Sequence, residues 1–237
     1  MMNRVPLLLF VLGYSFGLPS SLSLSGDGTG TRIIGGDEVV PTSVPYQAAV
    51  LLNGTFVCGG SLISTKVVLT AGHCAVAAVF AVVVLGAHDL RTIESTQQRF
   101  NTSDILVHEN YTEFLENDVA LVLLPEAAQL TTSVQIVELA PTSAPSYTGS
   151  SAYLTGWGMT HDASDTSPYL LVRPSNVCTS GVGVVGACHS DSGGPLVVDG
   201  VQVGIVSFGS GSCVDESPTG FVRVSYYRDW ILEHAGV

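Results

Sequence analysis

Short runs of β-forming residues, each closed by turn residues, recur along the chain and constrain its fold more than any other feature. Gly, Pro, Asn and Asp separate the runs. Many short strands at such spacing are typical of an all-β sandwich or barrel. We expect strands at Tyr46–Leu52, Thr55–Ile63, Val67–Thr70, Val79–Leu85, Ile105–His108, Val119–Leu124, Ser151–Gly156, Pro195–Val198 and Val201–Phe208.

The last segment, Tyr226–Ala235, follows a different period. Its large apolar side chains, at Tyr226, Tyr227, Trp230 and Ile231, recur at helical spacing. This pattern predicts one amphipathic C-terminal helix. A final strand is the alternative, because aromatic residues are also frequent in strands.

The composition excludes two classes of protein. Only 12% of the 237 residues are charged, and 8 basic against 20 acidic residues give a net charge of −12. Nucleic-acid binding needs clustered basic residues, whereas Lys66 is the single lysine of the sequence. Disorder needs low hydrophobicity, but 46% of the residues are hydrophobic. The length suits one large all-β domain or two small ones.

The N-terminus has the layout of a secretory signal peptide. Arg4 precedes an apolar stretch from Val5 to Leu12, and small and turn residues follow up to residue 20. A buried N-terminal strand or helix is the alternative. This stretch and the apolar run Ala75–Leu85 are both too short to cross a bilayer. We therefore expect a secreted, extracellular protein with no membrane partner, and a Ser/Gly-rich spacer after the signal peptide.

Three short motifs carry chemistry. His73 ends a β-rich run in Leu69–Cys74, Asp118 opens an apolar strand in Asn117–Leu121, and Ser192 lies in the glycine-rich stretch Ser190–Pro195. A serine nucleophile needs a base within hydrogen-bond reach, and the base needs a carboxylate that fixes its tautomer. Taken singly, each residue has an ordinary structural explanation, such as a surface histidine or a turn aspartate.

Taken together, the motifs resemble those of the chymotrypsin-like serine peptidases, the family in which Ser-His-Asp catalysis was defined. T-A-G-H-C is similar to the family's histidine motif, N-D-V-A-L to its aspartate motif and D-S-G-G-P to its nucleophile motif. The order His–Asp–Ser is that of the chymotrypsins. The segments Gly156–Gly158 and Ser207–Gly209 are also similar to family segments. The resemblance runs from Ile33 to the C-terminus.

The resemblance implies a fold and a set of catalytic roles. The fold is all-β, with two packed six-stranded Greek-key β-barrels and a C-terminal helix. His73 is the general base and then the acid, Asp118 orients it, and Ser192 is the nucleophile. The backbone N–H groups of Ser190 and Ser192 form the oxyanion hole. The implied activity is that of a secreted serine endopeptidase working through an acyl-enzyme.

Substrate-binding positions follow from the same resemblance. Ser207 supports Asp118, and the edge made by Ser207, Phe208 and Gly209 pairs with the substrate backbone. Gly186 takes the base of the primary pocket, beside Ala187, and Thr219 stands in its wall. A base without a carboxylate favours apolar side chains, as in chymotrypsins. Thr219 narrows the pocket toward elastase-like preference, and acidic neighbours leave a basic side chain as a third option.

The resemblance also implies a zymogen. Cleavage after Arg32 by a trypsin-like protease frees the α-amino group of Ile33, which then pairs with Asp191 beside the nucleophile. The chain divides into a signal peptide (1–20), an activation propeptide (21–32) and a peptidase domain (33–237). We expect protein or peptide substrates, protein inhibitors, a monomer, and neither cofactor nor metal. The acidic, lysine-poor composition resembles that of arthropod gut proteases, with compositional drift as the alternative.

Two departures from the family pattern favour a second interpretation, a catalytically impaired or non-catalytic homologue. Ser190 stands where the family has glycine, and a side chain there can turn an oxyanion donor away. The stretch between Trp157 and Ser192 is about twenty residues shorter than in the family. We place the loss between Arg173 and Pro174, which predicts that the second barrel lacks a strand.

The five cysteines agree with this gap. An odd count leaves one cysteine over, and the sequence alone does not fix the pairing. The resemblance implies disulfides Cys58–Cys74 and Cys188–Cys213. Cys178 is then unpaired, and its family partner would lie in the missing stretch.

Overall fold

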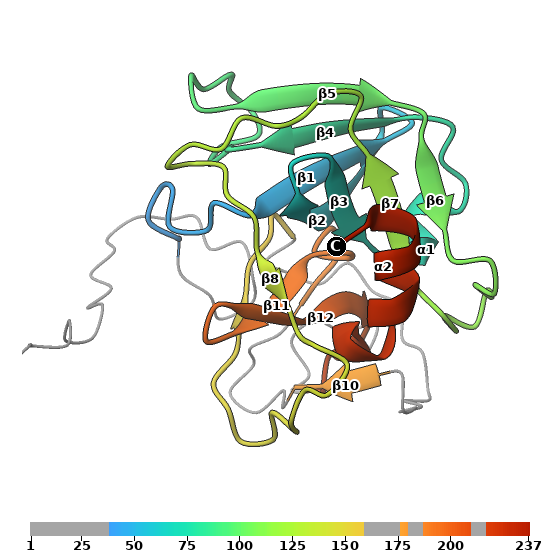
Figure 1. Ribbon diagram of the computed structural model, residues 1–237. Coiled ribbons are helices and arrows are strands. Elements are labelled where there is room, and N and C mark those ends of the chain that lie inside the picture. Colours follow the sequence, from blue (N-terminus) through green and yellow to red (C-terminus); the bar gives the residue numbers. More distant parts are fainter. Residues whose placement is uncertain (1–37, 159–175, 180–186, 210–216) are drawn as a thin grey trace, which may run out of the picture.

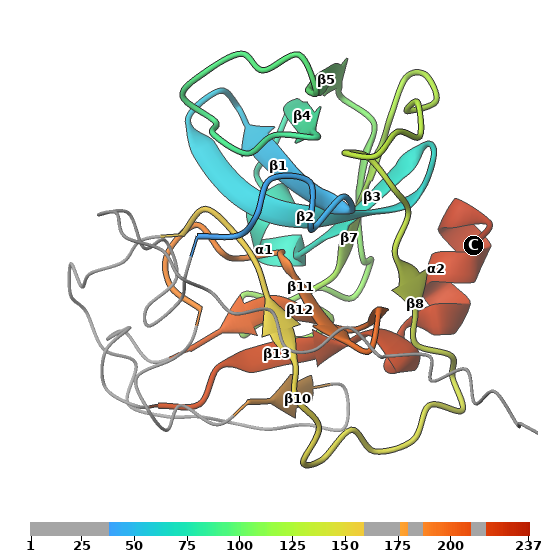
Figure 2. The ribbon, with the colours of Figure 1, turned by 90° about the vertical axis from the view of Figure 1, so that its left-hand side faces the viewer.

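Two β-sheets lie one above the other in the structure, a computed structural model that describes residues 38–158, 176–179, 187–209 and 217–237. Helix α1 (Gly72–Ala75) lies between them, and helix α2 (Arg228–Ala235) runs along one side (Figures 1 and 2). This arrangement of two packed sheets and a C-terminal helix is consistent with the predicted all-β fold of two packed β-barrels. Within the described residues, no helix has the length and hydrophobicity needed to cross a membrane.

The first sheet closes into a barrel. Its order is β5-β4-β1-β2-β3-β7-β6. The end strands β5 and β6 are separated only by residues 103–104, so they act as one bent strand that pairs with β4 on one side and β7 on the other. The strands are β1 Gln47–Leu52, β2 Phe56–Ser64, β3 Val67–Thr70, β4 Ala81–Leu85, β5 Gln98–Thr102, β6 Ile105–Val107 and β7 Ala120–Leu123.

The second sheet is a half-barrel. Its path is β10-β13-β12-β11-β9, with β8 pairing in parallel with β12. Among the described residues β9 and β10 stand at its two ends. The predicted gap at Arg173–Pro174 lies outside those residues, so the missing strand stays a prediction. The strands are β8 Glu138–Leu139, β9 Tyr153–Leu154, β10 Asn176–Cys178, β11 Pro195–Val198, β12 Val201–Phe208 and β13 Gly220–Arg223.

Several strands are apolar on both faces because both faces are buried. In β3, Val68 faces the interior of the first barrel, while Leu69 joins the core between the sheets. In β7, Val122 faces the interior of the first barrel and Leu121 joins the core between the sheets. The side chain of Ile231 in α2 fills the same inter-sheet core. The hydrophobic effect therefore fixes the two sheets against each other and positions the loops at their junction.

All nine predicted strands are found, although Ser151–Gly156 shortens to Tyr153–Leu154. Strands β5, β8, β10 and β13 were not predicted. The predicted C-terminal helix is a 3-10 turn (Val224–Tyr226) followed by α2, and Gly236 caps the end of α2 in the left-handed conformation. The alternative of a final strand is wrong.

Candidate active site

His73 and Asp118 meet at the junction of the two sheets. His73 lies in α1, directly after β3, and Asp118 precedes β7, the neighbour of β3. The His73 Nδ1 atom is 2.8 Å from Asp118 Oδ2, and the His73 backbone N–H donates to Asp118 Oδ1 at 2.6 Å. A β-carbon at Gly72 would lie 3.3 Å from Asp118 Oδ1, so a glycine there permits the close approach.

Asp118 is fully buried and accepts a third hydrogen bond, from the Ser207 hydroxyl at 2.6 Å. An ionised carboxylate only accepts hydrogen bonds, so His73 Nδ1 carries the proton in this pair. That tautomer leaves the Nε2 lone pair free to take up a proton. The structure thus places Ser207, which the resemblance assigned to support Asp118, in contact with this carboxylate.

Ser192 lies in a tight bend between the sheets. Its carbonyl accepts a hydrogen bond from Gly59 N–H of β2 at 2.7 Å. Gly193 N–H donates to Val206 of β12 at 2.9 Å, and Gly193 has φ of +79°. A β-carbon at Gly193 would overlap the Thr70 hydroxyl and lie 3.1 Å from the Ala71 nitrogen. Glycine thus brings the Ser192 bend against the segment that leads to His73.

Among the described residues, no hydrogen bond joins the Ser192 hydroxyl to His73. The His73 Nε2 atom is instead 3.7 Å from the sulfur of Cys74. Nucleophile–base contacts are often loose before substrate binds and tighten in the complex. The structure brings the two residues to the same junction without closing the contact between them.

Ser190 adopts a conformation that suits glycine. Its φ is +74°, in the left-handed region that costs a residue with a β-carbon about 1–2 kcal/mol. The family's glycine at this position is therefore explained by backbone geometry, and the serine is strained.

Asp191 is enclosed by two glycines of the Gly156–Gly158 segment. Its carboxylate accepts hydrogen bonds from the backbone N–H groups of Gly158 (2.8 Å) and Cys188 (2.9 Å). A β-carbon at Gly156 or at Gly158 would overlap this carboxylate. Burial raises the pKa of Asp191 to about 7, and the two N–H bonds oppose the rise. The Gly-Trp-Gly sequence is thus needed to make room for a buried acid.

The substrate-binding candidates are only partly assembled. Phe208 lies over Gly220, where its ring leaves no room for a β-carbon, and Gly209 is exposed in open space. The Thr219 hydroxyl accepts a hydrogen bond from Ala187 N–H at 3.3 Å, so these two pocket candidates are in contact. Gly186 lies outside the described residues, as do Arg32 and Ile33.

Two of the cysteine assignments lie within the described residues. Cys58 and Cys74 form a disulfide that ties β2 to α1, next to His73. Cys178 is a free cysteine, and burial raises its pKa. Cys188 is disulfide-bonded, and its expected partner Cys213 lies outside the described residues.

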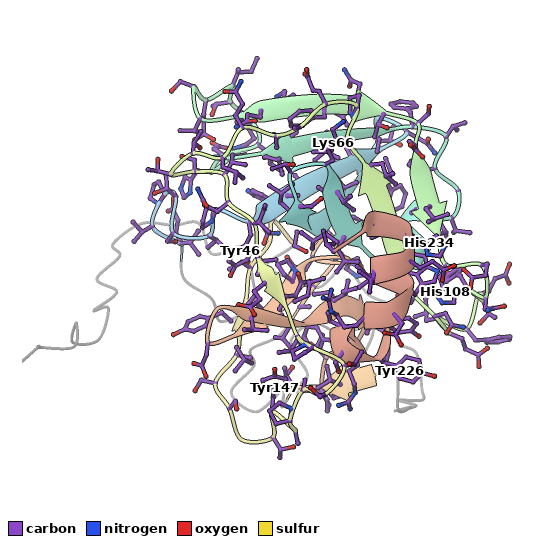
Figure 3. All side chains as sticks on the ribbon, in the orientation of Figure 1. Tyr46, Lys66, His108, Tyr147, Tyr226 and His234 are labelled. Carbon is purple, nitrogen blue, oxygen red and sulfur yellow. A yellow bond between two sulfur atoms is a disulfide. The ribbon has the colours of Figure 1, made fainter. Side chains whose placement is uncertain are left out.

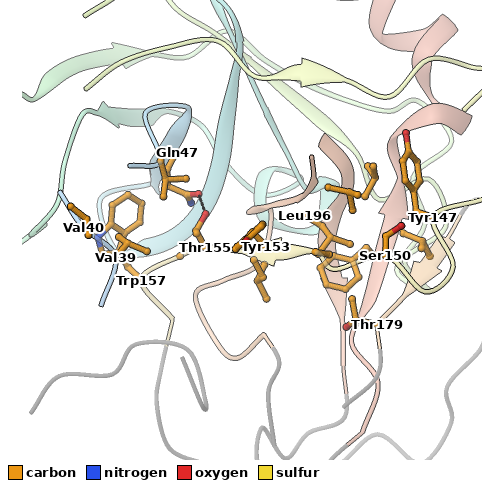
Figure 4. A pocket seen from close by; sticks show the side chains of 18 of the residues that line it. Val39, Val40, Gln47, Tyr147, Ser150, Tyr153, Thr155, Trp157, Thr179 and Leu196 are labelled. Carbon is orange, nitrogen blue, oxygen red and sulfur yellow. Dashed lines mark hydrogen bonds between the residues drawn. The ribbon is translucent and has the colours of Figure 1, made fainter. Parts of the chain in front are cut away.

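Figure 4 shows a cavity of about 950 Å³, whose described lining residues do not include His73, Asp118 or Ser192. It extends from Val39, at the start of the described residues, past Trp157 to Leu196 of the second sheet, and a hydrogen bond of 2.7 Å from Thr155 to Gln47 crosses its wall. The cavity is therefore lined by residues of both sheets. Among the described residues, no group of three or more His, Cys, Asp or Glu side chains is placed to hold a metal ion.

The sequence did not single out several residues that build the site. Thr70, whose hydroxyl donates to the Gly59 carbonyl at 2.8 Å, braces β2 beside the bend. Asn117 has φ of +52° and fixes the turn that presents Asp118. Asn117 belongs to the Asn117–Leu121 motif quoted above, so the sequence drew attention to its position. Its role could not be inferred from the motif, because its partners are distant in sequence.

Comparisons with known proteins agree on one family. The Trypsin family model matches residues 33–231. Brachyurin from Leptuca pugilator is 39% identical over 226 residues, covering 86% of this chain and 99% of brachyurin. Chymotrypsin from Phaedon cochleariae is 36% identical over 228 residues, covering 86% and 82% of the two chains. Chymotrypsin-C from Rattus norvegicus is 37% identical over 243 residues, covering 86% and 88%.

Proposed function

Since the chain belongs to the trypsin family of serine endopeptidases, we propose that it hydrolyses peptide bonds with Ser192 as nucleophile, His73 as base and Asp118 as the group that orients His73. The observation that carries the proposal is the buried Asp118 carboxylate, 2.8 Å from His73 Nδ1 and bonded to Ser207. A fully buried carboxylate with three donors, one of them the His73 ring, is costly to maintain for structure alone.

The reaction follows from this geometry. His73 Nε2 takes the Ser192 hydroxyl proton while Oγ attacks the scissile carbonyl, and Asp118 stabilises the imidazolium that forms. The backbone N–H groups of Ser190 and Ser192 hold the oxyanion. The C–N bond then breaks as His73 gives its proton to the leaving amine. A water molecule, activated by the same histidine, attacks the acyl-Ser192 ester and releases the acid.

We also propose that the chain is made as a secreted zymogen, with the gut lumen as its place of action. A trypsin-like protease cuts after Arg32, and the new ammonium group of Ile33 pairs with Asp191. The support is the raised pKa of Asp191, because a buried acid that meets no countercharge among the described residues favours a partner of positive charge. The parts would be residues 1–20 as signal peptide, 21–32 as propeptide and 33–237 as a monomeric peptidase domain open to protein inhibitors.

For specificity we propose a chymotrypsin-like or elastase-like preference. The support is the contact between Thr219 and Ala187, two uncharged residues, and the uncharged Gly186 at the expected pocket base. The relatives named chymotrypsin agree with an apolar preference.

A second candidate is a family member with impaired catalysis. Strain at Ser190, which would supply an oxyanion donor, favours it. The match with brachyurin spans 226 aligned positions but takes up 86% of this 237-residue chain, about 204 residues. About twenty of those positions therefore have no residue of this chain, in keeping with a shortened second barrel.

Labelling with a fluorophosphonate probe tests the two candidates. The precursor is cut after Arg32 with an immobilised trypsin-like protease, which is then removed, and Ser192→Ala is the matched control. The endopeptidase proposal expects labelling of the cut chain at Ser192 and none of the control. Labelling that does not depend on Ser192, or none at all, would refute it and leave the impaired homologue. Preference for Arg over Phe, Leu, Ala and Val substrates would overturn the assignment of Gly186.

A further inference from the structure

The start of the C-terminal helix is hydrogen-bonded to the turn that presents Asp118. The hydroxyl of Tyr227, the residue before α2, donates to Asn117 Oδ1 at 3.1 Å. Tyr227 is only 3% exposed, and Asn117 immediately precedes Asp118 in the chain. This bond spans 110 residues of sequence and plays no part in the mechanism above.

Asn117 is held at both ends of its side-chain amide. Its Nδ2 donates to the Asn110 carbonyl at 2.8 Å, while its Oδ1 receives the Tyr227 hydroxyl. Its backbone has φ of +52°, a left-handed conformation that asparagine tolerates better than most residues. Its carbonyl accepts a hydrogen bond from Val119 N–H at 2.8 Å, which closes a tight turn around Asp118. The direction of the Asp118 side chain therefore depends on how Asn117 is held.

Helix α2, which directly follows Tyr227, is itself fixed to the same loop. The Trp230 indole N–H donates to Glu109 at 2.9 Å, and the His108 ring stacks on the Trp230 ring with centroids 5.0 Å apart. The Tyr227 ring meets His108 edge-on at 5.6 Å. Figure 3 shows His108 beside α2, with His234 on the helix above it. Tyr227 is thus a fixed point from which Asn117 can be held.

We propose that Tyr227 is a positioning residue, which orients the Asp118 carboxylate toward His73 by holding Asn117. The inference rests on the proposed roles of His73 and Asp118. Asp118 contacts its partners at 2.6–2.8 Å, so a small rotation of the turn would lengthen these bonds. Tyr227 acts through Asn117, so its loss changes how well His73 is oriented rather than how substrate binds.

Tyr227→Phe removes the hydroxyl and keeps the ring. One neutral hydrogen bond corresponds to a loss in kcat of about three- to tenfold, with KM nearly unchanged. Tyr226→Phe is the matched control, because Tyr226 is the neighbouring residue, is 58% exposed and also touches the Tyr227 ring. Rates are normalised by fluorophosphonate titration, so that a smaller folded fraction is not counted as slower chemistry.

Two measurements separate positioning from a merely structural role. The first is the low-field proton NMR signal of the His73 Nδ1–H bonded to Asp118, which needs no turnover. It should move upfield or broaden in Tyr227→Phe and stay unchanged in Tyr226→Phe. The second is a double-mutant cycle with Asn117→Gly, which keeps the left-handed backbone and removes the acceptor. The two effects on kcat should be strongly non-additive.

Each outcome decides the question. If Tyr227→Phe changes neither kcat nor the NMR signal, or if its effect adds fully to that of Asn117→Gly, Tyr227 does not position Asp118. The positioning role is also overturned if fluorophosphonate titration shows that the lower rate comes entirely from a smaller folded fraction. If the wild-type chain shows no Ser192-dependent turnover but the signal still changes in Tyr227→Phe only, the proposed function fails and the positioning contact stands.

Discussion

The buried carboxyl group of Asp191 makes the stability of the uncut chain depend on pH. Asp191 is fully buried, and the hydrogen bonds from Gly158 and Cys188 do not offset the loss of hydration. Its pKa therefore rises from 3.8 to about 7. Between these two values the folded chain retains a proton on Asp191 that the unfolded chain has released.

The sign and the size of the effect follow from that difference. Because the folded pKa lies above the unfolded one, the stabilisation is fully present below about pH 4 and is lost as the pH rises through about 7. At about 1.4 kcal/mol for each pH unit, the free energy of unfolding falls by about 4 kcal/mol across this window.

Urea unfolding of the uncut chain and of its Asp191→Asn variant at pH 4 to 8 measures this quantity. Both carry Ser192→Ala, which prevents self-cleavage. The amide of the variant faces a backbone N–H donor, which changes its free energy of unfolding by an amount that does not depend on pH. The quantity compared is therefore how the difference in free energy of unfolding between the two chains changes with pH. The wild-type chain should lose about 4 kcal/mol relative to the variant. Asp199→Asn, at an exposed turn residue, is the control and should show no such trend.

A difference that stays flat from pH 4 to 8 would refute the reasoning, because it would mean that Asp191 is already ionised in the folded, uncut chain. The cut chain supplies the opposite case. If the Ile33 ammonium pairs with Asp191, the pKa of folded Asp191 lies below the unfolded value of 3.8, so the wild-type chain should gain stability over Asp191→Asn as the pH rises to about 4. It should keep that stability above pH 4, where the uncut chain loses its own.

Three further substitutions test other parts of the site. Ser190→Gly should raise the free energy of unfolding by about 0.5–1 kcal/mol, since left-handed strain of about 1–2 kcal/mol exceeds the entropy cost of glycine; Ser190→Ala keeps the β-carbon and should gain nothing, and an equal gain would assign the effect to the hydroxyl. Replacing Cys58 and Cys74 together by serine should lower the free energy of unfolding by about 3 kcal/mol, because the disulfide closes a loop of 16 residues. Urea unfolding measures this loss, and an unchanged midpoint would contradict the prediction. Ser207→Ala removes a donor from buried Asp118 and should lower kcat about tenfold or more with little change in KM, whereas an unaltered kcat would show that Asp118 is held without it.

The sequence predicted the strands whose apolar pattern is strong and missed those without one. Val67–Thr70 and Pro195–Val198 have the bounds that the sequence predicted. Strand β5 was missed because Gln98–Thr102 carries a single buried residue, Phe100. Its place in the barrel comes from pairing with β4 rather than from its own periodicity. Such tertiary pairing is not encoded in a local pattern.

The candidate site divides in the same way. The motifs identified His73, Asp118 and Ser192, since a base, a carboxylate and a serine are recognisable by type. They did not reveal why Gly158 is required, because the carboxylate that would overlap a β-carbon there comes from Asp191, far along the chain. Contacts between distant segments are fixed by packing, so they become visible only in three dimensions.

The bend that carries Ser192 contains two features that would be unfavourable in isolation. Ser190 has a positive φ, and Asp191 is a buried acid. Such a segment persists only where the surroundings over-determine it. Here the surroundings are both barrels, since Gly59 of the first and Val206 of the second each hydrogen-bond to the bend. Loosening the contact between the barrels should therefore disorder the bend before it unfolds either sheet. The second sheet then affects function mainly through how firmly Val206 holds the bend that carries Ser192.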